Sequence, residues 1–317
     1  MKKLISIVIP AYNEQDNVDE LARRLRGVFE LNSKYEFEAI IVENGSLDNT
    51  YEKLLAVHQQ DPRFKILQLA RNFRMDGGLT AGLNFASGDA AVIMTADLQD
   101  PPELIGQFIE KWEDGYENVY GIVTKRNGTS LLRRFNSQLF YKLANALTGG
   151  MIPRNVSDFR LVDRKVYRAI NSIHERNRFV RGLFAWVGFK SIGIEHERAE
   201  RFAGVSGAHT LKVLELALKA IFAHSYVPLK FITVVGIAVS ILSFGLLLWI
   251  VVKAVLWGVP FEGYGTIMTV MLLMFGILFT MLGIVSEYIG MIYEEVKQRP
   301  NYVVRDVKGL YDSSNKE

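Results

Sequence analysis

Short apolar runs alternate with helical patterns over roughly the first 125 residues of the chain. Each run ends in polar or small residues, which is typical of a buried strand. The strands expected are Leu4–Pro10, Phe37–Glu43, Phe64–Ala70, Ala90–Thr95 and Asn118–Thr124. Helical patterns lie between them, at about 16–31, 49–60, 77–87 and 101–114. This alternation predicts an α/β fold, with a mostly parallel sheet covered by helices on both faces.

Two long apolar stretches dominate the later part of the chain. Phe231–Val252 and Gly263–Ser286 contain no charged residue. Each exceeds the ~20 residues that a helix needs to cross a hydrocarbon core of roughly 30 Å. Only about eight residues, Val255–Glu262, connect them. The pattern predicts two transmembrane helices that form a hairpin.

Cationic residues gather outside this hairpin rather than in its connecting loop. They are Lys212, Lys219, Lys230, Lys297, Arg299, Arg305 and Lys308, against Lys253 at the edge of the loop. The positive-inside rule therefore predicts that both chain ends lie in the cytoplasm. The amphipathic stretch Leu211–Tyr226 precedes the hairpin, and it is interpreted as an interfacial helix rather than one packed on the core.

The amino-acid composition and the motifs that are missing argue against several kinds of functional site. The 317-residue chain has no cysteine, which excludes disulfides, thiolate nucleophiles and thiolate metal sites. Its five histidines show no zinc spacing and are interpreted as surface or packing residues. The formal net charge is only +3, and no nucleic-acid partner is expected. No phosphate-binding loop of the G-x-x-x-x-G-K-[S/T] type and no G-x-G-x-x-G after a strand occurs, which argues against P-loop and dinucleotide enzymes.

Polar residues follow each of the first three predicted strands. The segments are 10–14 (P-A-Y-N-E), 43–50 (E-N-G-S-L-D-N-T) and 71–78 (R-N-F-R-M-D-G-G). Each alone is compatible with ordinary turn chemistry. Together, at successive strand ends of an open α/β sheet, they predict a nucleotide site.

The fourth predicted strand ends at an acidic cluster that two prolines follow. Asp97, Gln99 and Asp100 offer hard oxygen ligands suited to Mg²⁺ or Mn²⁺. The alternative for Asp100 is that its side chain caps the helix that begins at the prolines.

These segments carry a resemblance. P-A-Y-N-E, the E-N-G-S-x-D-x-T segment, R-N-F and A-D-L-Q-D-P-P-E together resemble the family 2 glycosyltransferases of the GT-A fold. Within them the chain resembles the polyprenyl-phosphate branch, which is GtrB-like and dolichyl-phosphate mannose synthase-like. The likeness continues through 157–163 (S-D-F-R-L-V-D) and 201–206 (R-F-A-G-V-S).

The resemblance implies a role for individual residues. The nucleotide would contact Pro10, Tyr12, Glu14, Val42, Glu43, Asn44, Arg71, Ala96 and Asp97. The metal, Mg²⁺ or Mn²⁺, would be held by Asp97 and Gln99. The acceptor phosphate would be held by Arg126, Arg133, Ser137, Arg160 and Arg201. Two positions depart from the family pattern, because Thr95 replaces the first acid of the usual D-x-D and Asn44 replaces a common second acid.

A purely structural role is an alternative for the Arg133–Ser137 pair and for Asp158. Arg133 and Ser137 share one face of an amphipathic pattern over 130–147, which suits either a phosphate grip or a solvated helix face. The resemblance makes Asp158 the candidate general base, but Asp158 is also interpretable as a structural carboxylate paired with Arg160. A polyprenyl phosphate is mostly a dianion at cytoplasmic pH, so an orienting role for Asp158 is a third option.

The function implied is inverting transfer of one sugar, glucose from UDP-glucose, to polyprenyl phosphate at the cytoplasmic membrane face. The alternatives are a membrane-tethered nucleotide-sugar sensor or scaffold and a small transporter. The lack of ionisable residues within the spans disfavours the transporter.

The domains expected are 1–210 (GT-A catalytic), 211–228 (interfacial helix), 229–290 (two transmembrane helices) and 291–317 (cytoplasmic tail). A homo-oligomer, with a tetramer as the working guess, is expected. Residues 301–307 are interpreted as a short strand or a hairpin, with another subunit as one possible pairing partner.

Overall fold

The computed structural model describes residues 2–124, 156–176, 178–198, 227–257 and 263–310. The helix expected over 130–147 and the interfacial helix expected over 211–226 lie outside these residues. The chain divides into two compact units, Met1–Ala217 with Arg299–Glu317, and Leu218–Gln298. Each unit is described by itself below.

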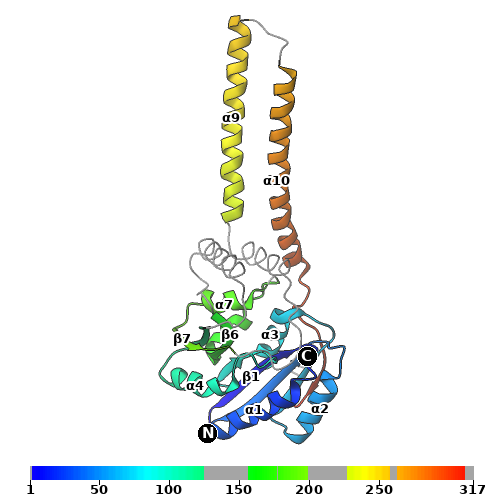
Figure 1. Ribbon diagram of the computed structural model, residues 1–317, viewed down its shortest axis with the longest axis vertical. Helices are drawn as coiled ribbons and strands as arrows, with labels where there is room; N and C mark the ends of the chain where they lie inside the picture. Colours follow the sequence, from blue (N-terminus) through cyan, green and yellow to red (C-terminus); the bar gives the residue numbers. More distant parts are fainter. Residues whose placement is uncertain (1, 125–155, 177, 199–226, 258–262, 311–317) are drawn as a thin grey trace. The chain divides into compact units, whose positions relative to one another are not determined.

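The first unit is an α/β domain, as the sequence predicts (Figure 1). Its strands are β1 (Leu4–Ala11), β2 (Glu36–Glu43), β3 (Phe64–Leu69), β4 (Ala90–Ile93), β5 (Asn118–Val123), β6 (Val156–Asp163), β7 (Ser191–His196) and β8 (Val304–Lys308). Its helices are α1 (Val18–Leu31), α2 (Thr50–Gln60), α3 (Arg74–Phe85), the 3-10 turn η1 (Pro102–Leu104), α4 (Ile105–Glu113), α6 (Arg164–Asn171) and α7 (Val180–Trp186).

The strands form one sheet in the order β7-β5-β6-β4-β1-β2-β3-β8. β1 to β4 are mutually parallel, and β6 runs against both β4 and β5. β7 is parallel to β5. The sheet is therefore mostly parallel, and β6 and β8 are its two reversed strands.

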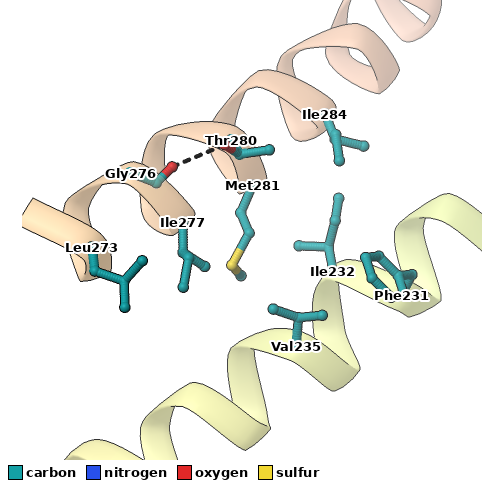
Figure 2. A pocket seen from close by; sticks show the side chains of 9 residues that line it. All are labelled: Phe231, Ile232, Val235, Leu273, Gly276, Ile277, Thr280, Met281 and Ile284. Carbon is teal, nitrogen blue, oxygen red and sulfur yellow. Dashed lines mark hydrogen bonds between the residues drawn. The ribbon is translucent and has the colours of Figure 1, made fainter.

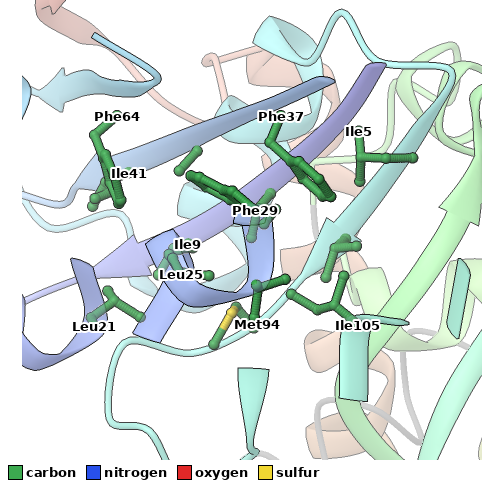
Figure 3. Close-up of a cluster of buried hydrophobic side chains, with 14 of the residues drawn as sticks. Ile5, Ile9, Leu21, Leu25, Phe29, Phe37, Ile41, Phe64, Met94 and Ile105 are labelled. Carbon is green, nitrogen blue, oxygen red and sulfur yellow. The ribbon is translucent and has the colours of Figure 1, made fainter. Parts of the chain in front are cut away.

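Alternating side chains of each strand serve two separate apolar layers. Ile5, Ile7 and Ile9 of β1 belong to the larger core, with side chains of α1, α2 and α4. Val8 points the other way, into a core with α3, α6 and α7. Figure 3 shows the larger core, where Phe29 stacks on Phe37 with ring centroids 4.9 Å apart. Burial on both faces explains the continuous apolar runs of the central strands.

The C-terminal segment corrects one expectation. Residues 304–308 do form a strand, but β8 pairs antiparallel with β3 of the same chain rather than with another subunit. The residues just before β8 also contact the rest of the first unit. The backbone carbonyl of Val303 accepts a hydrogen bond from the backbone N–H of Ala70 (2.9 Å). The hydroxyl of Tyr302 accepts one from the side-chain amide of Asn84 (3.1 Å). The segment that follows α10 thus completes one edge of the sheet.

The second unit consists of two long helices in contact, α9 (Val227–Trp257, 31 residues) and α10 (Tyr264–Lys297, 34 residues). α10 continues well past Ser286, where the apolar stretch ends. Large apolar side chains are exposed along both helices, for example Phe244 and Phe279, which are 69% and 67% exposed. Among the described residues, one segment, Leu273–Lys297, is long and apolar enough to cross a membrane.

A groove of about 460 Å³ runs between the two helices (Figure 2). Its lining is apolar, with Val235 of α9 and Ile277 and Met281 of α10 among the side chains. The one hydroxyl in this lining belongs to Thr280, which donates to the backbone carbonyl of Gly276 (2.9 Å). That internal bond satisfies the hydroxyl without a partner outside the helix.

Candidate active site

The carboxyl ends of the parallel strands meet at one edge of the sheet, here called the strand-end edge. Ala11 and Glu43, the last residues of β1 and β2, are paired across the ladder. β4 ends beside β1, and β6 begins at the same edge because it runs the opposite way. The chain leaves β1 toward β2 on one side and returns as β4 on the other. Ligands of open α/β sheets bind at such a switch point.

The loops after β1 and β2 are joined directly. Asn13, at φ +55°, donates its backbone N–H to the hydroxyl of Ser46 (3.1 Å), and its side-chain oxygen accepts from the N–H of Leu47 (2.8 Å). The hydroxyl of Thr50 accepts from the N–H of Glu14 (2.9 Å) and donates to Asp48 (2.6 Å). The two predicted nucleotide segments therefore form one structure.

The loops after β2 and β3 are also joined. The buried side chain of Asn44 donates to the carbonyl of Arg74 (2.9 Å) and accepts from the N–H of Phe73 (2.9 Å). Gly45 has φ +70°, and a Cβ there would lie 2.6 Å from the backbone carbonyl carbon of Arg71. Only glycine allows this close approach. Asn44 thus joins the loop after β2 to the loop after β3.

The predicted nucleotide residues divide by exposure. Tyr12 is 38% exposed, and the guanidinium of the exposed Arg71 lies 4.1 Å from the ring centroid of Phe73. Glu43 is buried and accepts from the N–H of Ser46 (2.5 Å). The side chains of Pro10, Val42 and Ala96 are also buried. Tyr12 and Arg71 are the exposed members of this group, and Glu14 is partly exposed, with its carboxylate accepting from the side-chain amide of Asn17.

The loop after β4 holds the two predicted metal ligands. Thr95 donates its hydroxyl to Asp97 (2.7 Å), and the N–H of Gln99 approaches the same oxygen (3.4 Å). Leu98 between them has φ +56°, so the loop turns sharply. The described residues contain no group of three or more acidic or histidine side chains arranged to hold a metal. One carboxylate and one amide oxygen suit Mg²⁺ or Mn²⁺ when phosphate oxygens complete the shell.

Asp100 is neither a helix cap nor an open metal ligand. η1 and α4 begin without a side-chain cap, and Asp100 is 2% exposed. One carboxylate oxygen accepts from His196 Nε2 (2.8 Å) and Arg198 Nε (3.1 Å). The other accepts from Arg198 Nη2 (2.7 Å) and the Ser157 hydroxyl (2.8 Å). Burial alone would raise the pKa of Asp100, but these hydrogen bonds and the arginine charge outweigh it and lower the pKa to about 2.

Asp158 lies where β6 begins, and its partner is not the expected one. Its carboxylate accepts two hydrogen bonds from Arg181 of α7 (2.7 and 2.5 Å). Burial by itself would raise the pKa of Asp158, but the charges of Arg181 and Arg160 hold it below its usual value. Nearby, Asp76 of α3 accepts from the N–H of Val180 (3.0 Å), and its burial raises its pKa.

Arg160 is placed differently from the sequence-based expectation. It is 3% exposed and donates to the backbone carbonyls of Ser157 (3.2 Å) and Asp158 (3.4 Å). Its guanidinium also lies 4.4 Å from the ring centroid of Phe184, and burial lowers its pKa to about 10. This geometry suits support of the β6 backbone better than a grip on a lipid phosphate. The other predicted phosphate residues, Arg126, Arg133, Ser137 and Arg201, lie outside the described residues.

Comparison with known families decides the identity of the catalytic unit. Residues 6–170 match the model of glycosyl transferase family 2. The chain belongs to this family. Residues 227–292, which span α9 and most of α10, match the GtrB C-terminal hairpin. The resemblance seen in the sequence is therefore confirmed, and the chain is a glycosyltransferase.

Relatives of this glycosyltransferase match along nearly the whole chain. An uncharacterized glycosyltransferase of Synechocystis is 41% identical over 96% of this chain and 96% of its own. The uncharacterized glycosyltransferase YkcC of Bacillus subtilis is 40% identical over 96% of this chain and 94% of its own. The SfII prophage-derived bactoprenol glucosyl transferase of Shigella flexneri is 37% identical over 95% of this chain and 97% of its own.

Four polar residues of the glycosyltransferase site escape the sequence analysis. They are Ser157, Arg181, His196 and Arg198. His196 is buried and packs against Phe159, which agrees with its interpretation as a packing residue, but its contact with Asp100 was not predicted. The nearest available signal was Arg198, which precedes the R-F-A-G-V-S segment by three residues, yet no local spacing connects it with Asp100.

Proposed function

We propose that this glycosyltransferase transfers a single glucose from UDP-glucose to polyprenyl phosphate, with inversion, at the cytoplasmic face of the membrane. The observation that carries the proposal is that one chain combines a family 2 catalytic unit with a GtrB hairpin. The 37% identity to a bactoprenol glucosyl transferase supports the choice of glucose and lipid. A soluble donor and a bilayer-bound acceptor require a catalytic unit fixed at the headgroup plane.

In this reaction an oxygen of the acceptor phosphate attacks C1 of the sugar, and the bond between C1 and the diphosphate oxygen breaks. UDP leaves with the electron pair. Because the second pKa of a phosphate monoester is about 6, the acceptor is largely a dianion and has no proton to lose. The loops after β1 to β3 would hold the nucleotide. A bound Mg²⁺ or Mn²⁺, held by Asp97, Gln99 and the phosphates, would offset the negative charge of the leaving diphosphate.

For Asp158 we favour an orienting role over that of a general base. A base is most effective when its pKa lies near the working pH. The pKa of Asp158 is lowered by Arg181, which makes the carboxylate a weak base. The pair can instead fix the position of Arg181, which is 31% exposed and carries a positive charge that suits recognition of a phosphate.

The direct test is a panel of radiolabelled nucleotide sugars incubated with membranes that contain the protein. UDP-glucose is expected to give organic-soluble label, and membranes with Asp97→Ala serve as the control. Label from a different sugar alone would contradict the assignment of glucose. No lipid label with any donor, together with retained UDP binding, would favour a nucleotide-sugar sensor or scaffold.

The anchor is tested by replacing residues 227–298 with a flexible linker. A truncation at Tyr226 would also remove β8, which completes the sheet next to β3. The linker variant is expected to bind UDP normally but to transfer poorly to long-chain acceptors, and a short water-soluble polyprenyl phosphate should restore part of the activity. Unchanged transfer to the native lipid would mean that the hairpin does not present the acceptor.

The proposed topology is that α9 and α10 both cross the membrane, with both chain ends in the cytoplasm. Since the chain has no cysteine, single cysteines report their side of the membrane cleanly. Gly258→Cys, between the helices, is expected to react with an impermeant thiol reagent added outside. Ser33→Cys and Ser313→Cys are expected to react only after the cells are opened. Reaction of all three from one side would refute the hairpin.

A further inference from the structure

Asp100 contacts side chains from several segments that meet at the strand-end edge. It follows the predicted metal ligands Asp97 and Gln99 by three residues and by one residue. Its carboxylate contacts Ser157 at the start of β6, His196 at the end of β7 and Arg198 just beyond β7. Here these four side chains are called the Asp100 network. Its members lie 57 to 98 residues away from Asp100 along the chain.

The carboxylate of Asp100 has no capacity left for a ligand. An ionised carboxylate offers about four acceptor positions. Both oxygens of Asp100 already accept two hydrogen bonds each, at 2.7 to 3.1 Å. The side chain of Asp100 is 1% exposed, so substrate does not reach it. Any influence of Asp100 on the reaction must therefore pass through the segments that it connects.

Each of those segments leads to a residue with an expected role. Ser157 directly precedes Asp158, and its hydroxyl also accepts from the N–H of Phe159 (3.2 Å). Arg198 stands three residues before Arg201, one of the predicted acceptor-phosphate residues. The loop after β4, which carries Asp97 and Gln99, is here called the donor-metal loop. The network thus joins this loop to two segments on the proposed acceptor side of the site.

The position of His196 is restricted from its other side as well. A Cβ at Gly121 of β5 would lie 2.6 Å from Cε1 of the imidazole ring. A glycine within a strand often marks such a close approach. The ring of Phe159 meets the same imidazole edge-on, with centroids 6.4 Å apart. His196 is therefore held in one orientation, with Nε2 toward Asp100.

We propose that Asp100 is a positioning residue that fixes the position of the donor-metal loop relative to the acceptor-side segments at β6 and β7. The proposal rests on the proposed transfer to a lipid phosphate. If the network is broken, the nucleotide loops and the Thr95–Asp97 bond remain, because none of them uses its members. Turnover should then fall much more than the affinity for UDP and metal.

The test uses Ser157→Ala and Arg198→Gln, singly and together, because Asp100→Asn would leave the partly buried Arg198 without its counter-charge. The sheet supplies a matched control at its opposite edge, where the buried carboxylate of Glu38 accepts from Ser87 (2.7 Å) and Lys65 (2.6 Å). Ser87→Ala and Lys65→Gln remove the same kinds of partner far from the strand-end edge. The full chain in detergent is used throughout.

Four quantities are measured for each variant: Kd for UDP with Mn²⁺, kcat, KM for the lipid phosphate, and the melting temperature. The Arg198→Gln variant is expected to lose at least 10-fold in kcat, with Kd within about 3-fold of the parent. The double variant should lose less than the product of the single losses, since both act through Asp100. Arg198→Lys, which keeps the charge, should recover part of the turnover. The control variants should lower the melting temperature but keep kcat within about 2-fold.

Two results would overturn the proposal. If kcat is unchanged while the melting temperature falls, the Asp100 network only stabilises the fold. If the affinity for UDP and Mn²⁺ collapses together with turnover, Asp100 belongs to the donor site itself. If the parent protein transfers another sugar, the same comparison is made with that donor. A parent that transfers no sugar refutes the proposed function and this proposal together, and the failure is visible before any variant is compared.

Discussion

The strand-end edge has two halves, the proposed donor half and the proposed acceptor half, which are held together differently. In the donor half, the loops after β1 and β2 are joined through Asn13, Ser46 and Thr50, whose partners lie 33 to 36 residues apart along the chain. In the acceptor half, buried or partly buried carboxylates meet arginines, and Asp100 and Arg198 are 98 residues apart. The donor half uses mainly backbone groups and short polar side chains, and the acceptor half uses ion pairs.

This difference has energetic consequences. A neutral hydrogen bond contributes only about 0.5–1.5 kcal/mol. Removing one member of a buried ion pair costs about 3–5 kcal/mol, because the remaining charge stays buried without a partner. The donor half should therefore tolerate single substitutions, and the acceptor half should not. Only the acceptor half should respond strongly to acid.

The largest effect is expected where the two halves meet, at Asp97. Asp97→Ala should lower kcat by about 10³-fold, because charge stabilisation on the leaving diphosphate is worth several kcal/mol. Asp114→Ala, which removes an exposed carboxylate at the end of α4, is the control. Turnover is measured with and without EDTA. Undiminished activity of the parent in EDTA would refute the metal assignment.

The next effect concerns Asp158 and distinguishes orientation from base catalysis. Because Arg181 lowers its pKa, Asp158 is ionised over the whole range from pH 6 to 8.5. Asp158→Asn should lower kcat by about 10²-fold, with a similar loss at every pH in this range. Arg181→Gln should produce the same profile. A base would behave differently, since activity of Asp158→Asn would recover as the acceptor phosphate deprotonates above pH 6.

Acid stability provides a measure of the acceptor half that does not depend on activity. The pKa of Asp100 is lowered to about 2 in the fold, from 3.8. The stabilisation, about 2 kcal/mol, is present above pH 3.8 and is lost as the pH falls through 2. Asp100→Asn should therefore be less stable than the parent at pH 6, and the difference should shrink toward pH 2. Thermal unfolding of both proteins across this range checks the sign, and a constant difference would contradict it.

The smallest effect is expected in the donor half. Ser46→Ala removes the acceptor for the N–H of Asn13, a neutral and exposed hydrogen bond (3.1 Å). UDP affinity should fall by no more than about 5-fold, which corresponds to about 1 kcal/mol. The loss should be equal at pH 6 and pH 8, because no charge is involved. A loss that exceeds that of Arg198→Gln in kcat would reverse the comparison between the two halves.

Local patterns were sufficient for most of the fold. The apolar runs located β1 to β5 to within two residues of their ends, since strands buried on both faces are continuous in hydrophobicity. α3 is the main difference, because it begins at Arg74 rather than near Gly77. Its first turn contains polar residues and is followed by Gly77 and Gly78, which weaken the helical pattern. The expectation of a strand after the hairpin was correct, but its partner was not.

The sequence by itself indicated the turn segments that form the proposed donor half. Asn13, Gly45 and Asp48 belong to turn segments. Because the conformation of a turn depends on neighbouring residues, the amino-acid types in these segments were enough to predict the turns. The partners of Asp100, Asp158 and Arg160 depended instead on the order of strands in the sheet. Reversal of β6 brings Ser157 and Asp158 beside β4, and β7 adds His196. Ion pairs between segments so far apart leave no periodic or local trace, which is why only the tertiary structure assigned Arg181 to Asp158 and Arg198 to Asp100.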